Sequence, residues 1–133
     1  MLVITTMSPY AVRALAELAR RGQATPVPIG EIARAREIPV QFLEGLFATL
    51  RRAGILQSQR GVKGGYSFAR PPSEITVLEV VELLEGELGG DAPDAGPVWV
   101  EAIDAVRGVL GGSTIADVAE REAHDSAAPM YYI

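Results

Sequence analysis

The chain has 133 residues, of which 48% are hydrophobic and 22% are charged, and its formal net charge is −5. This length allows one ordinary hydrophobic core, or a small binding unit with an oligomerisation arm. Cysteine is absent, which excludes disulfides, thiolate metal sites and a cysteine nucleophile. No apolar run approaches the ~20 residues of a membrane span, and the first residues do not resemble a signal peptide. We therefore expect a cytoplasmic protein without a membrane partner.

The sequence contains none of the common catalytic fingerprints. It has no nucleophile elbow, zinc-protease motif, phosphate-binding loop or dinucleotide motif. The single histidine, His124, lies in a polar stretch near the C-terminus and is expected to be a surface residue rather than a ligand. We expect neither an enzyme nor a bound metal or cofactor.

The charge is divided unevenly along the chain. Residues 1–70 carry ten Arg and Lys against four Glu, a net charge of +6, whereas residues 71–133 carry two Arg against thirteen acids, a net charge of −11. A basic half followed by an acidic half indicates one part that approaches a polyanion and one part that faces away from it. Two solvated surfaces of different composition are the alternative.

Helix signals divide the first 54 residues into three helices. Ser8 is expected to cap the first helix, with proline at the next position, and Gly22 is expected to end it. Pro28 begins a short second helix, and Pro39 marks the turn into a third. Gly54 follows the third helix, at a position where a left-handed C-cap favours a residue without Cβ.

The third helix has one apolar face and one small, polar face. Four large apolar residues recur at helical spacing and are expected to be buried: Leu43, Leu46, Phe47 and Leu50. The opposite face carries Gln41, Glu44, Gly45, Ala48 and Arg52. Gly45 costs roughly 1 kcal/mol relative to Ala in a helix interior, which suggests that something approaches closely there. Such a face suits the major groove, where Gln41 could pair with adenine and Glu44 could accept a hydrogen bond from cytosine. A solvated face with a tolerated glycine is the alternative.

A short basic hairpin follows this helix directly. Residues 55–59 alternate as a strand, and residues 66–69 form its partner. The turn between them combines glycines with two positive charges: Arg60, Gly61, Lys63, Gly64 and Gly65. Glycines allow backbone N–H groups to approach a phosphate and the cations neutralise it, although an ordinary surface hairpin would look similar. Three helices followed by two strands is the order of a winged helix-turn-helix. The predicted fold class is therefore mainly α with a small two-stranded wing.

The rest of the chain is expected to form helices around a linker. Thr76 and Glu79 have the spacing of a capping box at the start of a helix. Residues 86–97 are rich in glycine, proline and acids, so they are predicted to be a linker or an exposed loop. The helix after them carries an apolar stripe formed by Trp99, Ala102, Ile103, Val106 and Leu110. Thr114 then begins a last helix.

The apolar stripe must be buried against something. Packing onto its own domain is one option, but a dimer interface is favoured, because most soluble homo-oligomers are twofold and palindromic DNA matches that symmetry. The residues expected at this interface are Trp99, Ile103, Val106 and Leu110. We expect a winged helix-turn-helix domain over residues 1–85, a linker over 86–97, and C-terminal dimerisation helices over 98–133.

Five blocks of the sequence stand out as a set: Tyr10–Leu15, Gly30–Ala33, Ile38–Leu43, Leu50–Ile55 and Arg60–Tyr66. In order and spacing they resemble successive blocks of the Rrf-two family of winged-helix regulators, and the similarity covers about residues 3–120. The resemblance implies a homodimeric bacterial transcription regulator in which a long helix of each subunit crosses the other. By position it also implies that Glu44 reads bases and that Arg60 enters the minor groove from the wing.

The chain departs from this family where many members bind an iron–sulfur cluster. The resemblance implies three cysteines in the loop before the dimerisation helix, but that loop has none here, and Pro93 lies near the position of the last. Pro9 stands where other members have an acidic ligand, and a histidine sometimes found before the tryptophan is also missing. Asp91 and Asp94 would be hard ligands, poorly suited to iron–sulfur chemistry.

We therefore expect a homodimeric transcription regulator without a cluster, acting as a repressor at a palindromic operator in double-stranded DNA and controlled by a small-molecule or protein effector. The residues expected to contact DNA are Gln41, Glu44, Thr49, Arg51, Arg52, Arg60, Lys63 and Gly64. The alternative belongs to another class of protein, an interaction module that keeps the fold but acts by docking on a partner.

Overall fold

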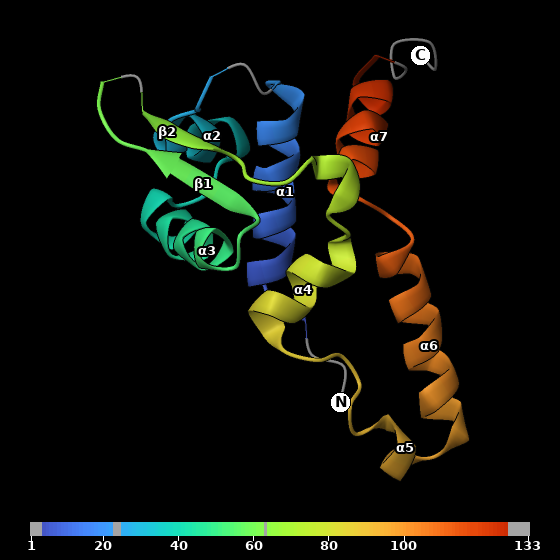
Figure 1. Cartoon of the computed structure of the whole chain (residues 1–133). Coiled ribbons are helices and arrows are strands. Elements are labelled where there is room, and N and C mark those ends of the chain that lie inside the picture. The colour runs from blue at the N-terminus through green and yellow to red at the C-terminus, as the bar shows by residue number, and fades with distance from the viewer. Residues whose placement is uncertain (1–3, 23–24, 63, 128–133) are drawn as a thin grey trace.

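Helices and one short hairpin alternate along the computed structural model, which describes residues 4–22, 25–62 and 64–127 (Figure 1). In chain order the elements are α1 (Met7–Arg20), α2 (Ile29–Arg36), α3 (Val40–Arg52), β1 (Leu56–Gln59), β2 (Gly65–Phe68), a 3-10 turn (Pro72–Glu74), α4 (Val77–Glu85), α5 (Ala92–Ala95), α6 (Pro97–Gly111) and α7 (Ile115–Ala127). Within the described ranges every helix is too short or too polar to cross a lipid bilayer.

The first five elements confirm the winged helix-turn-helix. Helices α1, α2 and α3 pack on one another, and Gly54 ends α3 with a φ of 82°, as the left-handed cap requires. Strands β1 and β2 pair antiparallel from Leu56 opposite Phe68 to Gln59 opposite Gly65. Both strands begin one residue away from the predicted starts, β1 later and β2 earlier, because pairing rather than side-chain alternation sets the ends of the ladder.

A third segment supports the wing that β1 and β2 form. The Val27 N–H donates to the Tyr66 carbonyl at 2.9 Å, and the Tyr66 N–H donates to the Val27 carbonyl at 2.8 Å. A Cβ at Gly65 would lie 2.3 Å from the Val27 carbonyl carbon, so only glycine permits this approach. The Tyr66 ring packs edge-on against Phe47 of α3, with ring centroids 5.1 Å apart. The wing is therefore held against α3 and against the segment before α2.

The start of α1 differs from the prediction that Ser8 caps it. The helix begins at Met7, and Ser8 is buried, with 2% of its surface exposed. Its hydroxyl donates to a carboxylate oxygen of Glu85 at 2.8 Å, and the Thr5 N–H donates to the same oxygen at 2.9 Å. The Glu85 carboxylate therefore supplies a negative charge at the α1 N-terminus and ties it to the end of α4.

The N-terminal and C-terminal parts of the described chain contribute to one hydrophobic core. Ile115 at the start of α7 is fully buried, and its N–H donates to the Ile75 carbonyl at 2.8 Å. Leu88 and Ala92, from the segment predicted to be a linker or exposed loop, are 3% and 6% exposed, and this segment contains α5. These two side chains anchor the segment to the structure, while most of its other residues are exposed, as the prediction of an exposed loop expected.

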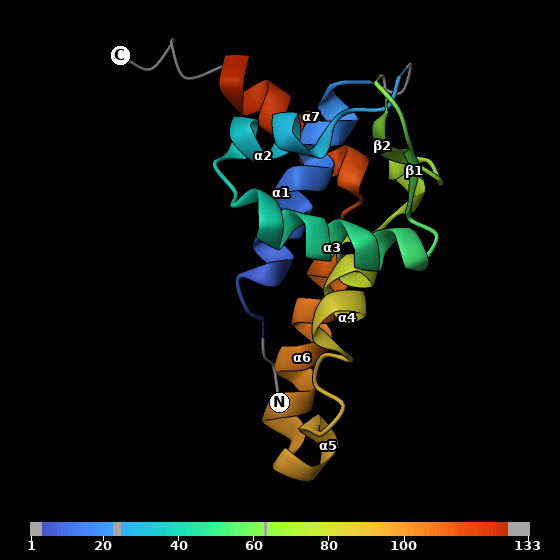
Figure 2. The same ribbon diagram turned by 90° about the vertical axis from the view of Figure 1, so that its left-hand side faces the viewer.

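Different elements lie on the two sides of α1. Figure 1 shows α3 and the wing on one side of α1, with α6 and α7 on the other. Turning the molecule brings α3 to the front, with the wing at one end of it (Figure 2). Since the basic half of the sequence builds α1 to β2 and the acidic half builds α4 to α7, the charge division in the sequence becomes a division between two sides of the molecule.

Candidate nucleic-acid interface

Helix α3 presents one face to the core and one to solvent, as its pattern predicted. The four apolar residues Leu43, Leu46, Phe47 and Leu50 are buried. On the opposite side Gln41, Glu44 and Gly45 are exposed, and Arg51 and Arg52 are exposed at the end of the helix. Thirteen residues give a helix about 20 Å long, and a DNA major groove is wide enough to admit an α-helix.

Gly45 is not required by the fold. Its backbone is helical, it is exposed, and a Cβ built there would have no atom within 4 Å outside its own helical surroundings. An alanine would fit and would favour the helix by roughly 1 kcal/mol. The absence of a side chain here therefore leaves space for a molecule outside the protein.

Hydrogen bonds organise the last turn of α3. The Thr49 hydroxyl, half-buried, donates to the Gly45 carbonyl at 3.2 Å and accepts from the Arg52 guanidinium at 3.2 Å. The Arg51 guanidinium donates to the Ser58 hydroxyl of β1 at 3.4 Å, which joins the helix to the wing. All these partners are neutral, so no described residue compensates either guanidinium charge, and both are available to phosphates.

The wing carries the other predicted contacts. Arg60 is exposed directly after β1 and makes no hydrogen bond or ion pair with a described residue. A Cβ at Gly64 would lie 2.2 Å from the Gln59 carbonyl oxygen, so the closing of the turn itself requires glycine there. Lys63 lies outside the described residues. Of these residues, the structure brings Arg60 and Gly64 to the wing tip, beyond the Gln59–Gly65 pair that ends the ladder.

Three other cations of the basic half are neutralised within the protein. Arg21 and Arg36 pair with Glu17, and Arg70 pairs with Glu79 at 2.6 Å. This ion pair raises the pKa of Arg70, mainly through the hydrogen bond from the guanidinium to the Glu79 carboxylate. Among the described residues of α3 and the wing, the cations without an ion pair are Arg51, Arg52 and Arg60, all of which the sequence predicted to contact DNA.

One further basic residue belongs with them. Arg34 of α2 is exposed and makes no ion pair with a described residue. In a helix-turn-helix the helix before the recognition helix crosses the DNA backbone, which makes Arg34 a candidate phosphate contact. The sequence places Arg34 in the last turn of α2. Arginine in that position also stabilises a helix C-terminus, so its place in the sequence fits both roles.

The residues predicted for the dimer interface do not share one surface of the described chain. Ile103 is 7% exposed and lies against Gly89, while Val106 and Leu110 pack on the chain's own core. Trp99 is half-exposed. The uncovered side of α6 instead carries Val98, Ala102, Ala105 and Val109. These four follow the i, i+4, i+7, i+11 spacing of a second apolar face.

The chain matches the model of the Rrf2 family, described as an iron-dependent transcriptional regulator, over residues 4–121. It is 36% identical over 129 residues to a Mycobacterium tuberculosis protein described as an HTH-type transcriptional regulator, Rv1287, covering 87% of this chain and 80% of that one. It is 31% identical over 136 residues to the HTH-type transcriptional regulator CymR of Bacillus subtilis, covering 98% and 99% of the two chains.

Two solved structures are similar in fold. The structure of CymR, the global cysteine regulator of B. subtilis, superposes with a TM-score of 0.81 at 32% identity, covering 91% of this chain and 98% of that chain. The structure of IscR from T. potens superposes with a TM-score of 0.81 at 34% identity, covering 98% and 97%.

The fold, the free cations and the exposed recognition face define a DNA-binding transcription regulator of the winged helix-turn-helix class. The chain belongs to the Rrf2 family, the family to which its sequence blocks were similar. Transcription regulation rather than enzymatic chemistry is what the relatives have in common.

The family description implies iron, and the residues of this chain do not fit an iron–sulfur cluster. There is no cysteine in the sequence, and the one histidine, His124, is exposed on α7. Among the described residues no three His, Asp or Glu side chains are grouped so as to hold a metal ion. Since iron–sulfur clusters are held by thiolates, with imidazole as an occasional substitute, the donor set offered between α4 and α6 is the wrong chemistry.

Proposed function

We propose that this protein is a homodimeric repressor that reads a twofold-symmetric operator with α3 and the wing and that works without an iron–sulfur cluster. The observation that carries the proposal is the exposed face around Gly45, where space that the fold does not need adjoins uncompensated arginines. A base edge or a sugar–phosphate backbone can approach the helix closely there. As a regulator of bacterial DNA the protein would act in the cytoplasm.

Separate roles are proposed along this surface. Gln41 and Glu44 face base edges, because an amide can pair with adenine and a carboxylate can accept from cytosine. Arg60 enters a narrow minor groove, whose enhanced negative potential attracts arginine. Phosphates are contacted by Thr49, Arg51, Arg52, Lys63 and the backbone of Gly64.

The dimer is proposed to form through the uncovered face of α6. Val98 and Val109 are 71% and 69% exposed, and two alanines between them allow a second helix to come close. Trp99, half-exposed beside this face, would become buried in the same contact. An exposed apolar stripe of this length is stabilised by a partner, and a second copy of the chain gives the twofold symmetry that a palindromic operator needs.

Selection of bound fragments from random duplex DNA tests the proposal. We expect an enriched motif of two inverted half-sites whose centres lie about 10 bp, or a multiple of it, apart. A promoter carrying this motif over its start site should be transcribed less in the presence of the protein. Enrichment of a single half-site, or of no sequence, would contradict the twofold reading, and increased transcription would contradict repression.

A further inference from the structure

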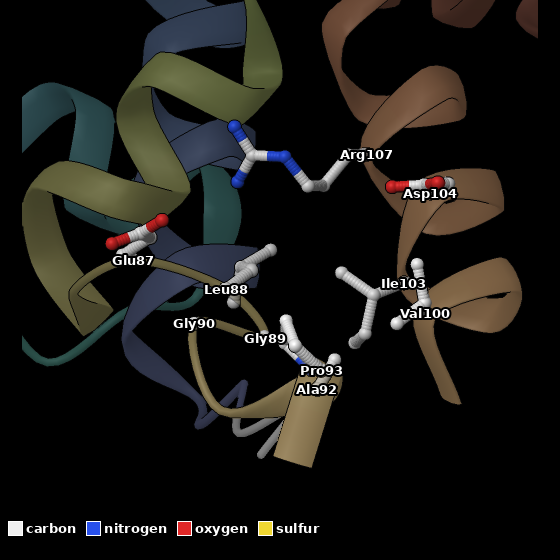
Figure 3. Close-up of a pocket in the computed structure, with 10 residues that line it drawn as sticks. All are labelled: Glu87, Leu88, Gly89, Gly90, Ala92, Pro93, Val100, Ile103, Asp104 and Arg107. Carbon is white, nitrogen blue, oxygen red and sulfur yellow. The ribbon is translucent and has the colours of Figure 1, made fainter. Parts of the chain in front are cut away.

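A cavity of about 260 Å³ lies between helix α6 and the segment that follows α4. Figure 3 shows its lining, with the segment and α5 on one side and α6 on the other. Its apolar lining is formed by Leu88, Ala92, Pro93, Val100 and Ile103. This volume lies just below the roughly 300–1,000 Å³ of drug-sized ligand sites, so the cavity suits only a small organic molecule.

The walls of this cavity are held by specific contacts. Gly89 has a φ of 72°, and a Cβ there would lie 2.4 Å from a side-chain carbon of Ile103, so the segment rests directly on α6. The Leu88 N–H donates to the Glu82 carboxylate at 3.0 Å, and the Arg107 guanidinium of α6 pairs with the same carboxylate. These contacts join α4, the segment and α6 around the cavity.

Of the charged side chains that line the cavity, one is paired with an opposite charge and two are not. Arg107 is neutralised by Glu82: burial raises the pKa of this carboxyl, but the hydrogen bonds from Leu88 and Arg107 lower it by more. Glu87 and Asp104 are exposed, and neither makes a hydrogen bond or ion pair with a described residue. Figure 3 shows them on opposite sides of the cavity, with Leu88 and Ile103 between them. The cavity thus combines an apolar middle with uncompensated negative charge at two sides.

We propose that this cavity binds an organic dication with an aliphatic body, of which the α,ω-diamines are the simplest, and that such a ligand is an effector of DNA binding. Each ammonium group pairs with one carboxylate, Glu87 or Asp104, while the methylene chain lies along the apolar lining, of which Pro93 and Val100 keep the most exposed surface. The net charge of −11 over residues 71–133 favours a cation over an anion here. The effector role rests on the proposed function, whereas the binding does not.

The position of the cavity gives the ligand a route to the DNA surface. Helix α4 packs against α1, α3 and α6, and Glu85 at its end holds the start of α1. A molecule that bridges Glu87 and Asp104 stabilises one placement of α6 relative to α4. Because α6 also carries the proposed dimer face, that placement sets the separation of the two recognition helices and shifts the population able to bind an operator.

Calorimetric titration of the full chain with 1,5-diaminopentane tests the binding step without DNA. Matched probes are 1-aminopentane with one charge, 1,5-pentanediol with none, and Mg²⁺ as a small dication. We expect the diamine to bind, the monoamine to bind several-fold more weakly, and the diol and Mg²⁺ not to bind. Glu87→Gln and Asp104→Asn should each weaken diamine binding about fivefold, since solvated ion pairs are individually modest. Glu120→Gln, an exposed change on α7, should have no effect.

A second variant keeps the charges and removes the space. Val100→Phe should narrow the cavity and abolish diamine binding, with circular dichroism confirming the helices. Equal binding of the diamine and the diol, or unchanged binding in the double variant Glu87→Gln/Asp104→Asn, would overturn the proposed site.

The effector step is read separately as operator affinity with and without the diamine. We expect the diamine to change the operator affinity of the unmodified protein but not that of the double variant. The double variant also controls for diamine that binds to the DNA itself. An equal change in both proteins would overturn the effector role. Operator binding measured without diamine tests the proposed function. A failure of the effector role can therefore be distinguished from a failure of the proposed function.

Discussion

Glycine serves different purposes at Gly45 and Gly64. At Gly64 a Cβ would meet the Gln59 carbonyl oxygen at 2.2 Å, so the turn cannot close with a larger residue. At Gly45 no atom of the described residues, outside its own helical surroundings, lies within 4 Å of the missing Cβ. Folding requires the first glycine, whereas it does not require the second, which we propose leaves room for DNA.

Gly45→Ala separates stability from binding. Alanine in a helix interior is favoured by roughly 1 kcal/mol, so we expect a higher thermal midpoint for the variant. We also expect weaker operator binding, because the added methyl occupies the space proposed for DNA. Thermal unfolding by circular dichroism and an anisotropy titration measure the two effects. Gly108→Ala on α6, also an exposed helical glycine with open space around it, is the matched control and should stabilise without weakening binding. Unchanged operator affinity in Gly45→Ala would contradict the close approach.

Glu44 is the acidic residue on the recognition face, and its removal should change specificity more than affinity. We expect Glu44→Ala to lose about 1–3 kcal/mol of discrimination at one base pair of the operator. Binding to random duplex should be equal or tighter, because a negative charge leaves a surface that faces phosphates. Competition titrations against single-base operator variants measure this. Loss of affinity by one common factor on operator and random DNA would show that Glu44 does not read a base.

At the scale of elements, an ion-pair network fixes α7 to the helix-turn-helix. The Arg36 guanidinium at the end of α2 donates to both Glu122 oxygens of α7, at 3.0 and 2.7 Å, and to Glu17 of α1 at 2.9 Å. Partial burial raises the pKa of Glu17, but hydrogen bonds from Arg21 and Arg36 outweigh it, so the net pKa lies below the ordinary 4.5. Glu17 therefore stabilises the fold through its ionised form.

A carboxyl group whose pKa is lowered by folding contributes stability above its unfolded pKa and loses it as the pH falls through the folded value. We expect the free energy of unfolding to fall as the pH drops below about 4.5. Glu17→Gln should cost about 1–2 kcal/mol at pH 7 and flatten this acid dependence. Urea unfolding between pH 3 and pH 7 measures both, with Glu120→Gln as control. An equally steep fall in Glu17→Gln would assign the acid sensitivity to other groups.

Most elements could be predicted from local signals. The buried stripe of α3, the cap at Gly54 and the cap at Thr76, whose hydroxyl accepts from the Glu79 N–H at 3.0 Å, all use residues close in sequence. The role of Ser8 could not be predicted, because its partner Glu85 is 77 positions away. The bridge between Val27 and Tyr66 also joins segments distant in sequence, which composition and periodicity do not reveal.

The exposed face of α3 could be predicted from local signals, as could the helix itself. Helical spacing alone places Gln41, Glu44 and Gly45 on one side. The dimer face that we propose on α6 could not be predicted in this way, because this helix has apolar residues on two sides. Only the fold shows that Ile103 is covered by Gly89 and that Val109 is left exposed.

At the scale of the whole molecule, the two faces of α6 predict different consequences of the same substitution. Val109→Asp should yield a folded monomer, since Val109 is 69% exposed, whereas Ile103→Asp should unfold the protein, since a charge would be buried. Light scattering and circular dichroism at micromolar concentration distinguish the outcomes. Glu101→Gln, an exposed change on the same helix, is the control. An unmodified protein that is monomeric at this concentration, or an unchanged dimer in Val109→Asp, would refute the proposed interface.

The most direct measurement of the central claim, that α3 and the wing bind duplex DNA through their free cations, is operator affinity as a function of salt. The account predicts that the logarithm of the binding constant falls linearly with the logarithm of salt, by roughly 0.9 for each phosphate neutralised. Lys63→Ala should reduce this slope by about one unit on every duplex, while Arg60→Ala should weaken the operator far more than random DNA. Binding that is independent of salt, or the absence of binding to any duplex, would contradict it.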